Sequence, residues 1–452
     1  MKGFMTLFRR ISWQGATLLV VFVLWTQVVA VTPPSNPPVP GEKSKNNSES
    51  QTQQGGGLAT RTFQTIFQYH RTSLFGQPHT FNVFPLVYWH LQTGLNLGLR
   101  TLLISTRRRP YQYQLYLQFL GSVTGGQRHK IILDYPRIGD SAFGIYAEGV
   151  WERDLLARYF GLGNNSVYQK AFTNKNDDRF VDEDYYLYNL KRPRFTVYGT
   201  LELLPQVVFW FGFGMEFIKP QLKDVPENSF FAQDQPFGYL GGTDRHFSFR
   251  LSWDTRKNKV FPTRGFLTEV SLEPTNSSVE EELQTARGTI TRSRSVSYYR
   301  YTFSDAHFIP LHANSLIFAN RFAFEAINGE APYYAYIEVA GERRSRSLGG
   351  SQSLRGFQSR RFLDKIRFFT LTELRYNYRK IHLMGQSIDL IFAVFFDTGR
   401  VWHSWSEIAF NDFHRTFGGG VWMNWNNRFI VRLDIGRSEE DIIPYFRMNT
   451  AF

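Results

Sequence analysis

From residue 81 to the end of the chain, apolar side chains recur at every second position. The segment 206–217 shows the pattern on one face with Val207, Phe209, Phe211, Phe213, Met215 and Phe217. The same alternation recurs in 111–119, 244–254 and 428–436. Successive side chains of a β-strand point to opposite faces, so each segment has one apolar and one polar face. The pattern predicts β-strands throughout this region.

We predict sixteen strands, at 82–90, 94–105, 111–122, 127–136, 141–154, 190–203, 206–218, 244–254, 264–273, 295–304, 315–326, 365–378, 386–397, 414–425, 428–437 and 442–452. Many of these segments contain ten or more residues. That is about the length of a tilted membrane-spanning strand, whereas strands of globular sheets usually have roughly five or six residues.

The connections between the predicted strands alternate between short and long. Every long connection follows an odd-numbered strand, at 155–189, 219–243, 274–294, 327–364 and 398–413. A soluble β-sandwich has no reason to gather its long loops at one end, whereas outer-membrane barrels have short periplasmic turns and longer extracellular loops. We therefore predict an all-β fold, a 16-stranded antiparallel transmembrane β-barrel with short periplasmic turns and long extracellular loops.

Composition agrees with this prediction. The chain has 452 residues, of which 17% are aromatic, and its mean hydropathy is −0.32. That value is too polar for a bundle of membrane helices, but a barrel needs an apolar residue only at every second position. The chain has no cysteine, which excludes disulfides, thiolate metal sites and iron–sulfur centres. The net charge of +13 is scattered and identifies no partner.

The N-terminus has the features of an export signal. Lys2, Arg9 and Arg10 precede an apolar run at 16–30 that ends on Ala30. The run is shorter than the roughly 20 residues of a membrane-spanning helix, so we predict a signal peptide at 1–30 with cleavage after Ala30. An uncleaved anchor is the alternative. We interpret 31–60 as a disordered periplasmic linker, 61–80 as a short N-terminal segment and 81–452 as the outer-membrane barrel.

Several motifs resemble those of the bacterial surface antigen superfamily of outer-membrane barrels, the BamA/TamA-like proteins. The connection at 327–364 contains Gly349, Gly350, Leu354, Arg355, Gly356 and Phe357, which resemble the (V/I/L)-R-G-(F/Y) motif of the sixth extracellular loop. Phe395, Asp397 and Gly399 are similar to the F-x-D-x-G motif of strand thirteen. The segments 160–165 and 372–375 also match, with Leu374 in place of a tyrosine.

The resemblance implies that the sixth loop folds into the barrel and that Arg355 pairs with Asp397. The alternation of strand 386–397 independently turns Asp397 inward, where a carboxylate can accept a bidentate guanidinium pair. Glu373 and Arg375 share the inward parity of their strand and would extend this network in the lumen. Gly356 would allow a tight loop tip. The alternative reading is that the pair only plugs and stiffens the barrel.

The resemblance further implies a role in membrane biogenesis, aiding insertion or translocation of protein or lipid at the outer membrane. The first and last strands, which contain Pro85 and Pro444, would then meet in a weak seam because proline cannot donate to a ladder. The expected partners are outer-membrane lipids, unfolded outer-membrane or secreted proteins, and a separate periplasmic protein. We expect a short member of the superfamily without POTRA domains. The alternative is a passive channel or structural surface barrel that has lost the insertase role with those domains.

The sequence gives little support for a catalytic, metal-binding or nucleic-acid-binding site. His403, Ser404, Asp412 and His414 fall in or beside one predicted loop, but neither G-x-S-x-G nor H-E-x-x-H occurs. We therefore expect no enzyme, no cofactor and no metal site. The run 107–109 of arginines lies in a predicted periplasmic turn, so we expect no nucleic-acid binding.

Overall fold

The computed structural model describes residues 70–74, 76–90, 94–107, 111–285, 288–312, 315–340, 345–383, 386–427 and 429–447. The predicted signal peptide at 1–30, its cleavage site at Ala30 and the predicted linker at 31–60 lie outside these residues. The first part of the predicted segment at 61–80 and the end of the last predicted strand also lie outside them.

One large antiparallel sheet dominates the described residues, and eighteen strands belong to it. Its strands are β1 (His70–Leu74), β2 (Gln77–His90), β3 (Gly94–Ser105), β4 (Gln114–Ser122), β5 (Gln127–Tyr135), β6 (Phe143–Arg158), β7 (Leu187–Lys191), β8 (Arg194–Leu204), β9 (Val207–Pro220), β10 (Gly242–Asp254), β11 (Gly265–Thr285), β12 (Gly288–His312), β13 (Leu316–Gly329), β16 (Ile366–Leu383), β17 (Gln386–Trp402), β18 (His414–Trp425), β19 (Phe429–Arg437) and β20 (Ile442–Arg447).

Short elements occupy the connections. They are the two-stranded ladder of β14 (Glu338–Val339) and β15 (Ser345–Arg346), the helix α3 (Phe230–Asp234), and the 3-10 turns η1 (Lys170–Thr173), η2 (Leu222–Asp224), η3 (Tyr333–Tyr336) and η4 (Trp405–Glu407). Within the described part of the chain, no helix is long and apolar enough to cross a bilayer.

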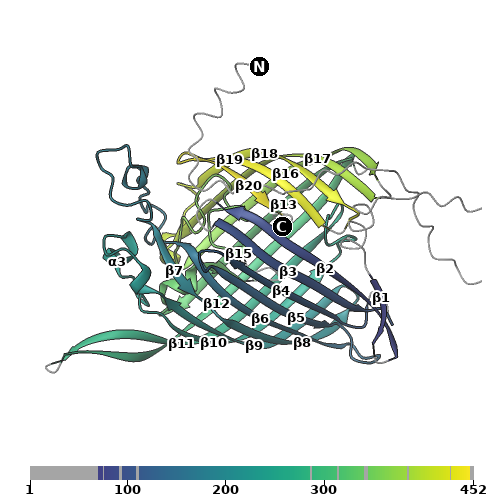
Figure 1. Cartoon of the computed structure of the whole chain (residues 1–452), viewed down its shortest axis with the longest axis horizontal. Coiled ribbons are helices and arrows are strands. Elements are labelled where there is room, and N and C mark those ends of the chain that lie inside the picture. The colour runs from purple at the N-terminus through teal and green to yellow at the C-terminus, as the bar shows by residue number, and fades with distance from the viewer. Residues whose placement is uncertain are drawn as a thin grey trace, which may run out of the picture.

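The strands of the sheet follow the chain, and almost every strand pairs with the next one. The sheet is strongly curled, so that the C-terminal strands, in yellow, come round toward the N-terminal strands, in purple (Figure 1). The prediction of a mostly β protein with one large antiparallel sheet is confirmed. Sixteen of the strands correspond to the sixteen predicted ones, and β1 and β7 are additional.

Strands β6, β16 and β17 extend beyond their predicted ends, since β6 ends at Arg158, β16 at Leu383 and β17 at Trp402, and two further predictions are wrong. The segment 190–203 is not one strand, because β7 ends at Lys191 and β8 begins at Arg194. Pro193 lies at the break, where its missing N–H cannot join a ladder. The segment 274–294 is not a long loop, because β11 and β12 pair without interruption from Gly265 with Phe308 to Thr285 with Gly288.

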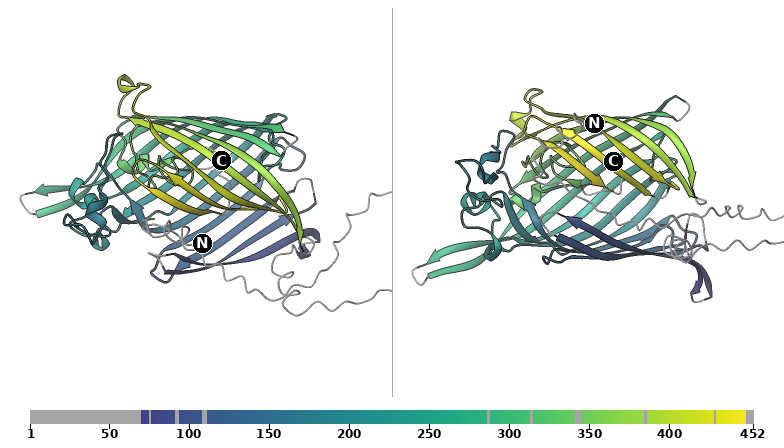
Figure 2. Two further views of the ribbon diagram at one scale, coloured as in Figure 1. Left: turned by 90° about the horizontal axis from the view of Figure 1, so that it is seen from above. Right: turned by 45° about the horizontal axis from the view of Figure 1, so that its top comes forward.

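The hairpin of β11 and β12 therefore extends beyond its neighbours. Pairing of β10 with β11 stops at Val279, and pairing of β13 with β12 stops at Tyr298. Figures 1 and 2 show the hairpin projecting from the end of the sheet that also carries α3. The side chains of 280–284 and 288–295 are polar on both faces apart from Leu283 and Ile290, which removes the alternation that identifies a strand by sequence while the backbone still pairs.

Polar side chains are buried on the inner face of the curled sheet and apolar side chains are exposed on its outer face. Phe119, Phe247 and Val394 are 57%, 59% and 59% exposed, whereas Arg250 and Arg432 are 7% and 0% exposed. This distribution is the reverse of a soluble protein core and is the one expected where the outer face contacts hydrocarbon.

Val394 lies in the middle of β17 on the outer face, and we predict that Val394→Arg lowers the free energy of unfolding by about 2–4 kcal/mol. The cost arises because the guanidinium would face hydrocarbon at mid-depth. Equilibrium unfolding from phospholipid vesicles, followed by tryptophan fluorescence, measures it. The control is Phe410→Arg in the loop after β17, a side chain 95% exposed, for which we expect almost no change. Equal, small effects at both positions would contradict a lipid-facing outer surface.

Candidate functional site

The described residues of the connection between β13 and β16, 330–340 and 345–365, lie against the inner face of the sheet, and we call them the plug loop. Its turn at 347–362 is closed by a bridge between Leu348 and Phe362. Gly349 has φ of 108°, and a Cβ there would lie 2.0 Å from the backbone oxygen of Gln358. Gly356 has φ of 114°, and a Cβ there would lie 2.8 Å from the backbone carbonyl carbon of Arg437. Side chains are excluded at both positions, so the two glycines allow the tip to form.

Arg355 lies at the tip of the plug loop and contacts two carboxylates. Its Nε and Nη2 donate to Oδ2 and Oδ1 of Asp397 at 2.8 and 2.6 Å, and its backbone N–H donates to Oδ2 at 3.2 Å. Its Nη1 donates to Oε1 of Glu373 at 2.5 Å. All three side chains are fully buried. Burial lowers the pKa of Arg355, but Asp397 and Glu373 outweigh it and hold that pKa above its ordinary value.

Aromatic rings complete the surroundings of Arg355. Its guanidinium carbon lies 3.6 Å from the centre of the Phe395 ring, a cation–π contact that is strong where water is excluded. Leu354 and Phe357 are buried in a hydrophobic cluster on either side of Arg355. Gly399, two residues beyond Asp397, leaves room for Leu348 of the plug loop, because a Cβ at Gly399 would lie 3.1 Å from its side chain.

The charged network continues along β16 and β19. Arg375 donates from Nε to Oε2 of Glu373 at 2.8 Å. Arg432 lies 3.3 Å from Asp434 and donates to the backbone oxygen of Ser351 in the plug loop at 2.8 Å. With Arg355 and Asp397, three guanidinium groups thus face three carboxylates. The equal numbers of positive and negative charges matter, because an unpaired charge buried at this site would lower the stability of the fold.

The structure brings together every predicted site residue that it describes. Leu354, Arg355, Gly356 and Phe357 of the loop motif contact the inner face, whereas Gly349 and Gly350 pack within the loop. Glu373 and Arg375 extend the network of Arg355 and Asp397, with the inward parity that the alternation predicts. Ala30 lies outside the described residues. Four polar side chains near the β17–β18 loop do not form a triad: Ser404 bonds to Ser406 and Glu407, His403 lies beside Asp364, and His414 lies beside Glu439.

Two arginines of this region were not identified from the sequence. Arg361 donates to Ser166 at 2.7 Å and pairs with Glu440 at 2.7 Å, while its guanidinium lies 4.6 Å from the Phe362 ring. Arg367 of β16 is fully buried and pairs with Glu325 of β13. The alternation that placed Glu373 inward also places Arg367 inward, so this second arginine could have been found.

The segment 160–165, noted in the sequence as a family-like motif, fastens neighbouring loops to the plug loop. Gly163 donates its N–H to the backbone oxygen of Leu363 at 2.8 Å. The Asn164 side chain donates to Asp412 and accepts from the N–H of Val401 at 3.1 and 3.2 Å. This segment therefore joins the plug loop to the end of β17 and the loop that follows it.

Burial and hydrogen bonds have opposite effects on two carboxyl groups in these connecting loops. Burial raises the pKa of Asp364, which lies 3.1 Å from Nδ1 of His403. The backbone N–H of His403 donates to Glu407 and lowers the pKa of that exposed carboxyl. In the part of the chain that the structure describes, no group of three or more acidic or histidine side chains could hold a metal ion.

Comparison with known proteins gives a family and several similar folds. A profile described as the Omp85 superfamily domain matches residues 162–432. BamA from Haemophilus ducreyi lacking POTRA domains 1–3 is similar at 14% identity, covering 86% of this chain and 77% of that chain with a TM-score of 0.48.

Two further solved structures are less similar. The beta domain of the Bordetella autotransporter Brka has 10% identity, covering 69% of this chain and 100% of that chain with a TM-score of 0.30. A bacterial polysaccharide outer membrane secretin has 10% identity, covering 78% and 88% of the two chains with a TM-score of 0.34. No curated protein matches the sequence.

Replacing Arg355 by alanine should lower the free energy of unfolding by about 3–5 kcal/mol, because Asp397 and Glu373 would remain buried beside each other without their shared cation. Arg355→Lys should also destabilise the protein, since an ammonium group cannot reproduce the bidentate pair. Urea unfolding of the refolded protein measures both effects.

Arg294→Ala provides the control for these variants. Arg294 of β12 makes an exposed ion pair with Glu330 of the plug loop at 2.6 Å. Loss of this pair should lower the free energy of unfolding by less than about 1 kcal/mol. A cost for Arg355→Ala no greater than that for Arg294→Ala would show that the buried network does not hold the loop.

Proposed function

Because the chain belongs to the Omp85 superfamily of outer-membrane β-barrels, we propose that it forms a closed sixteen-stranded barrel that aids insertion or translocation of protein or lipid at the outer membrane. The superfamily is non-enzymatic, in agreement with the prediction of no enzyme. In this proposal the short turns face the periplasm and the plug loop enters the lumen from the extracellular side.

The observation that carries the proposal is the fixed position of the Arg355 tip. A loop that served only to cover the barrel could be held by apolar contacts, which carry no desolvation cost. Here the tip introduces a cation, and the inner face supplies Asp397 and Glu373 to neutralise it. Buried ion pairs contribute little net stability but can specify one arrangement. The pairing therefore indicates that the function requires this one position of the loop, and it supports an assembly or transport role.

A passive channel or structural surface barrel is the second candidate. It is favoured by half-buried polar side chains on the inner face of β3 to β6, which include Arg100, Tyr116, Lys130 and Glu148. A water-filled lumen is lined in this way. Against it, the plug loop and the cluster of Tyr159, Phe231 and Tyr333 occupy the end that carries the long loops.

Export is part of the proposal. We propose that residues 1–30 form a cleaved signal peptide and that 31–60 form a periplasmic linker. The intact mass of protein purified from the outer membrane should then correspond to a chain that begins at Val31. A mass that includes residues 1–30 would instead support an uncleaved anchor.

The proposed role is tested by depletion and complementation. Cells depleted of the protein should lose a specific set of outer-membrane proteins or surface lipids, measured by quantitative mass spectrometry. The wild-type chain and Arg294→Ala should restore them, whereas Arg355→Ala should restore less than about a tenth. This expectation follows from misplacement of the tip once its buried pair is removed.

The comparison is valid only where the variant barrel still folds, which its heat-dependent mobility in gel electrophoresis reports. An unchanged envelope after depletion would overturn the assembly role. Conductance in planar bilayers would then distinguish the two remaining alternatives. A passive channel should pass current, whereas a structural surface barrel should not.

A further inference from the structure

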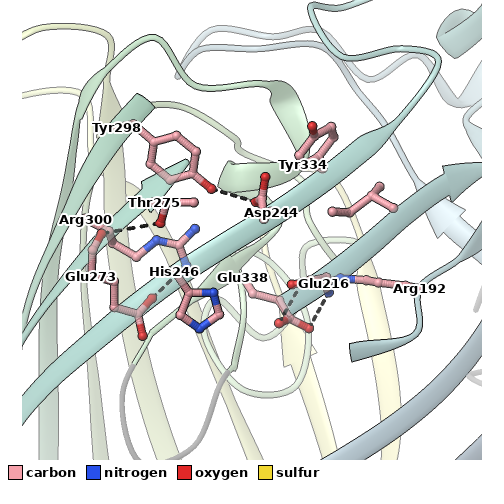
Figure 3. Close-up of a pocket in the computed structure, with 11 residues that line it drawn as sticks. Arg192, Glu216, Asp244, His246, Glu273, Thr275, Tyr298, Arg300, Tyr334 and Glu338 are labelled. Carbon is pink, nitrogen blue, oxygen red and sulfur yellow. Dashed lines mark hydrogen bonds and ion pairs between the residues drawn. The ribbon is translucent and has the colours of Figure 1, made fainter. Parts of the chain in front are cut away.

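The plug loop has a second charged attachment, on a different part of the sheet from Arg355. Glu338 of β14 is buried, and its carboxylate lies 2.7 Å from Nη1 of Arg192 and 3.2 Å from Nη1 of Arg194. The two arginines lie on either side of Pro193, where β7 gives way to β8. Arg192 also pairs with Glu216 of β9. Figure 3 shows Glu338 and Glu216 meeting the guanidinium of Arg192.

Two further hydrogen bonds hold the same limb of the loop, residues 332–338, which we call the first limb. The Tyr334 hydroxyl lies 2.9 Å from Oγ of Ser277 on β11. Nη2 of Arg300 on β12 donates to the backbone oxygen of Ala335 at 2.8 Å. These two partners lie on β11 and β12, and the ion-pair partners Arg192, Arg194 and Glu216 lie at β7–β9. The partners of Arg355 lie on β16 and β17, so the two attachments use separate strands.

The two attachments have largely separate apolar surroundings, which are shared only where Leu363 joins the cluster of the first limb and Val339, next to Glu338, joins the cluster of the tip. The first limb packs in a cluster with residues of β7, β9 and α3, which includes Tyr188, Ile218, Phe231, Tyr333, Tyr334 and Tyr336. The tip packs in another cluster with residues of β12, β16 and β17, which includes Phe308, Leu354, Phe357, Phe362, Phe369 and Val401. Loss of one attachment therefore exposes a different set of contacts from loss of the other.

Arg367 lies between the two parts of the loop and contacts both. It donates to the backbone oxygens of Tyr336 and Glu338, the latter at 2.8 Å, and to Oγ of Ser347 at 2.9 Å. Its own position is fixed by Glu325. Because Arg367 is fully buried and lies between the two parts, the tip can be displaced without moving the first limb.

We propose that the plug loop is held by two independent latches, with Glu338, Arg192 and Arg194 forming the second. In this arrangement Glu338 is a positioning residue for the first limb, and Arg355 positions the tip. Either latch can open while Arg367 keeps the other part in place. The proposal does not depend on an assembly role, because it concerns which part of the loop each ion pair holds.

The absence of cysteine makes the proposal directly measurable, since one introduced thiol is the only thiol in the chain. Ala335→Cys reports on the first limb and Ser353→Cys on the tip, and both positions are buried in the native protein. The rate of maleimide labelling is measured in vesicles. Glu338→Ala should accelerate labelling at position 335 more than about tenfold, because Arg192 and Arg194 lose a buried counter-charge. Labelling at position 353 should change less than about twofold.

Arg355→Ala should give the reverse result, with faster labelling at position 353 and little change at 335. Glu330→Ala is the matched control, because it removes an exposed ion pair of the same loop and should affect neither rate. If Glu338→Ala does not fold, Glu338→Gln, which keeps an acceptor without the charge, should still accelerate labelling at position 335 more than at 353. Equal acceleration at both positions, or none at 335, would overturn the second latch.

Discussion

The structure depends on one constraint: a backbone surrounded by hydrocarbon must satisfy its N–H and C=O groups within the protein. The continuous antiparallel ladder from β2 to β20 meets this requirement along the sheet. Because side chains of a strand alternate, the ladder also fixes which residues can be polar. Charged side chains such as Arg250 and Arg432 are confined to the inner face, and phenylalanine and valine cover the outer face.

That arrangement creates the conditions for the plug loop. An inner face with many charged side chains can neutralise a cation brought to it, whereas an apolar core could not. Arg355 arrives on a loop and finds Asp397 and Glu373 already turned inward by the register of β16 and β17. The same reasoning holds at Glu338, whose carboxylate pairs with the guanidinium groups of Arg192 and Arg194 on the inner face. The loop is thus positioned by ion pairs with charged side chains that the strand register turns to the inner face.

The long hairpin of β11 and β12 follows the same backbone rule outside the region where the outer face is apolar. Its strands pair with each other beyond the ends of β10 and β13, and its described side chains there are mostly polar on both faces. Exposed strand edges favour unwanted pairing, and polar side chains with charges of both signs counter this tendency. Glu281 and Arg294 form one such pair across the hairpin.

The amino-acid sequence determined the features that depend on local alternation and on short motifs. Sixteen strand segments and the inward parity of Asp397, Glu373 and Arg375 were predicted because each depends on a period of two. The position of Arg355 at the tip of an inward-folded loop was predicted from the resemblance of its motif to that of the surface antigen superfamily. The same signal failed at 274–294, where both faces are polar, and at Pro193, where a break interrupts an otherwise regular pattern.

Only the tertiary structure decided the contacts between residues far apart in the chain. Glu338 and Arg192 are separated by 146 positions, and Arg361 and Ser166 by 195. Their meeting depends on the path of the plug loop across the curled sheet and on which loops lie beside it. Alternation specifies the face on which a side chain lies but carries no information about that path, because a loop has no repeating backbone geometry to extrapolate.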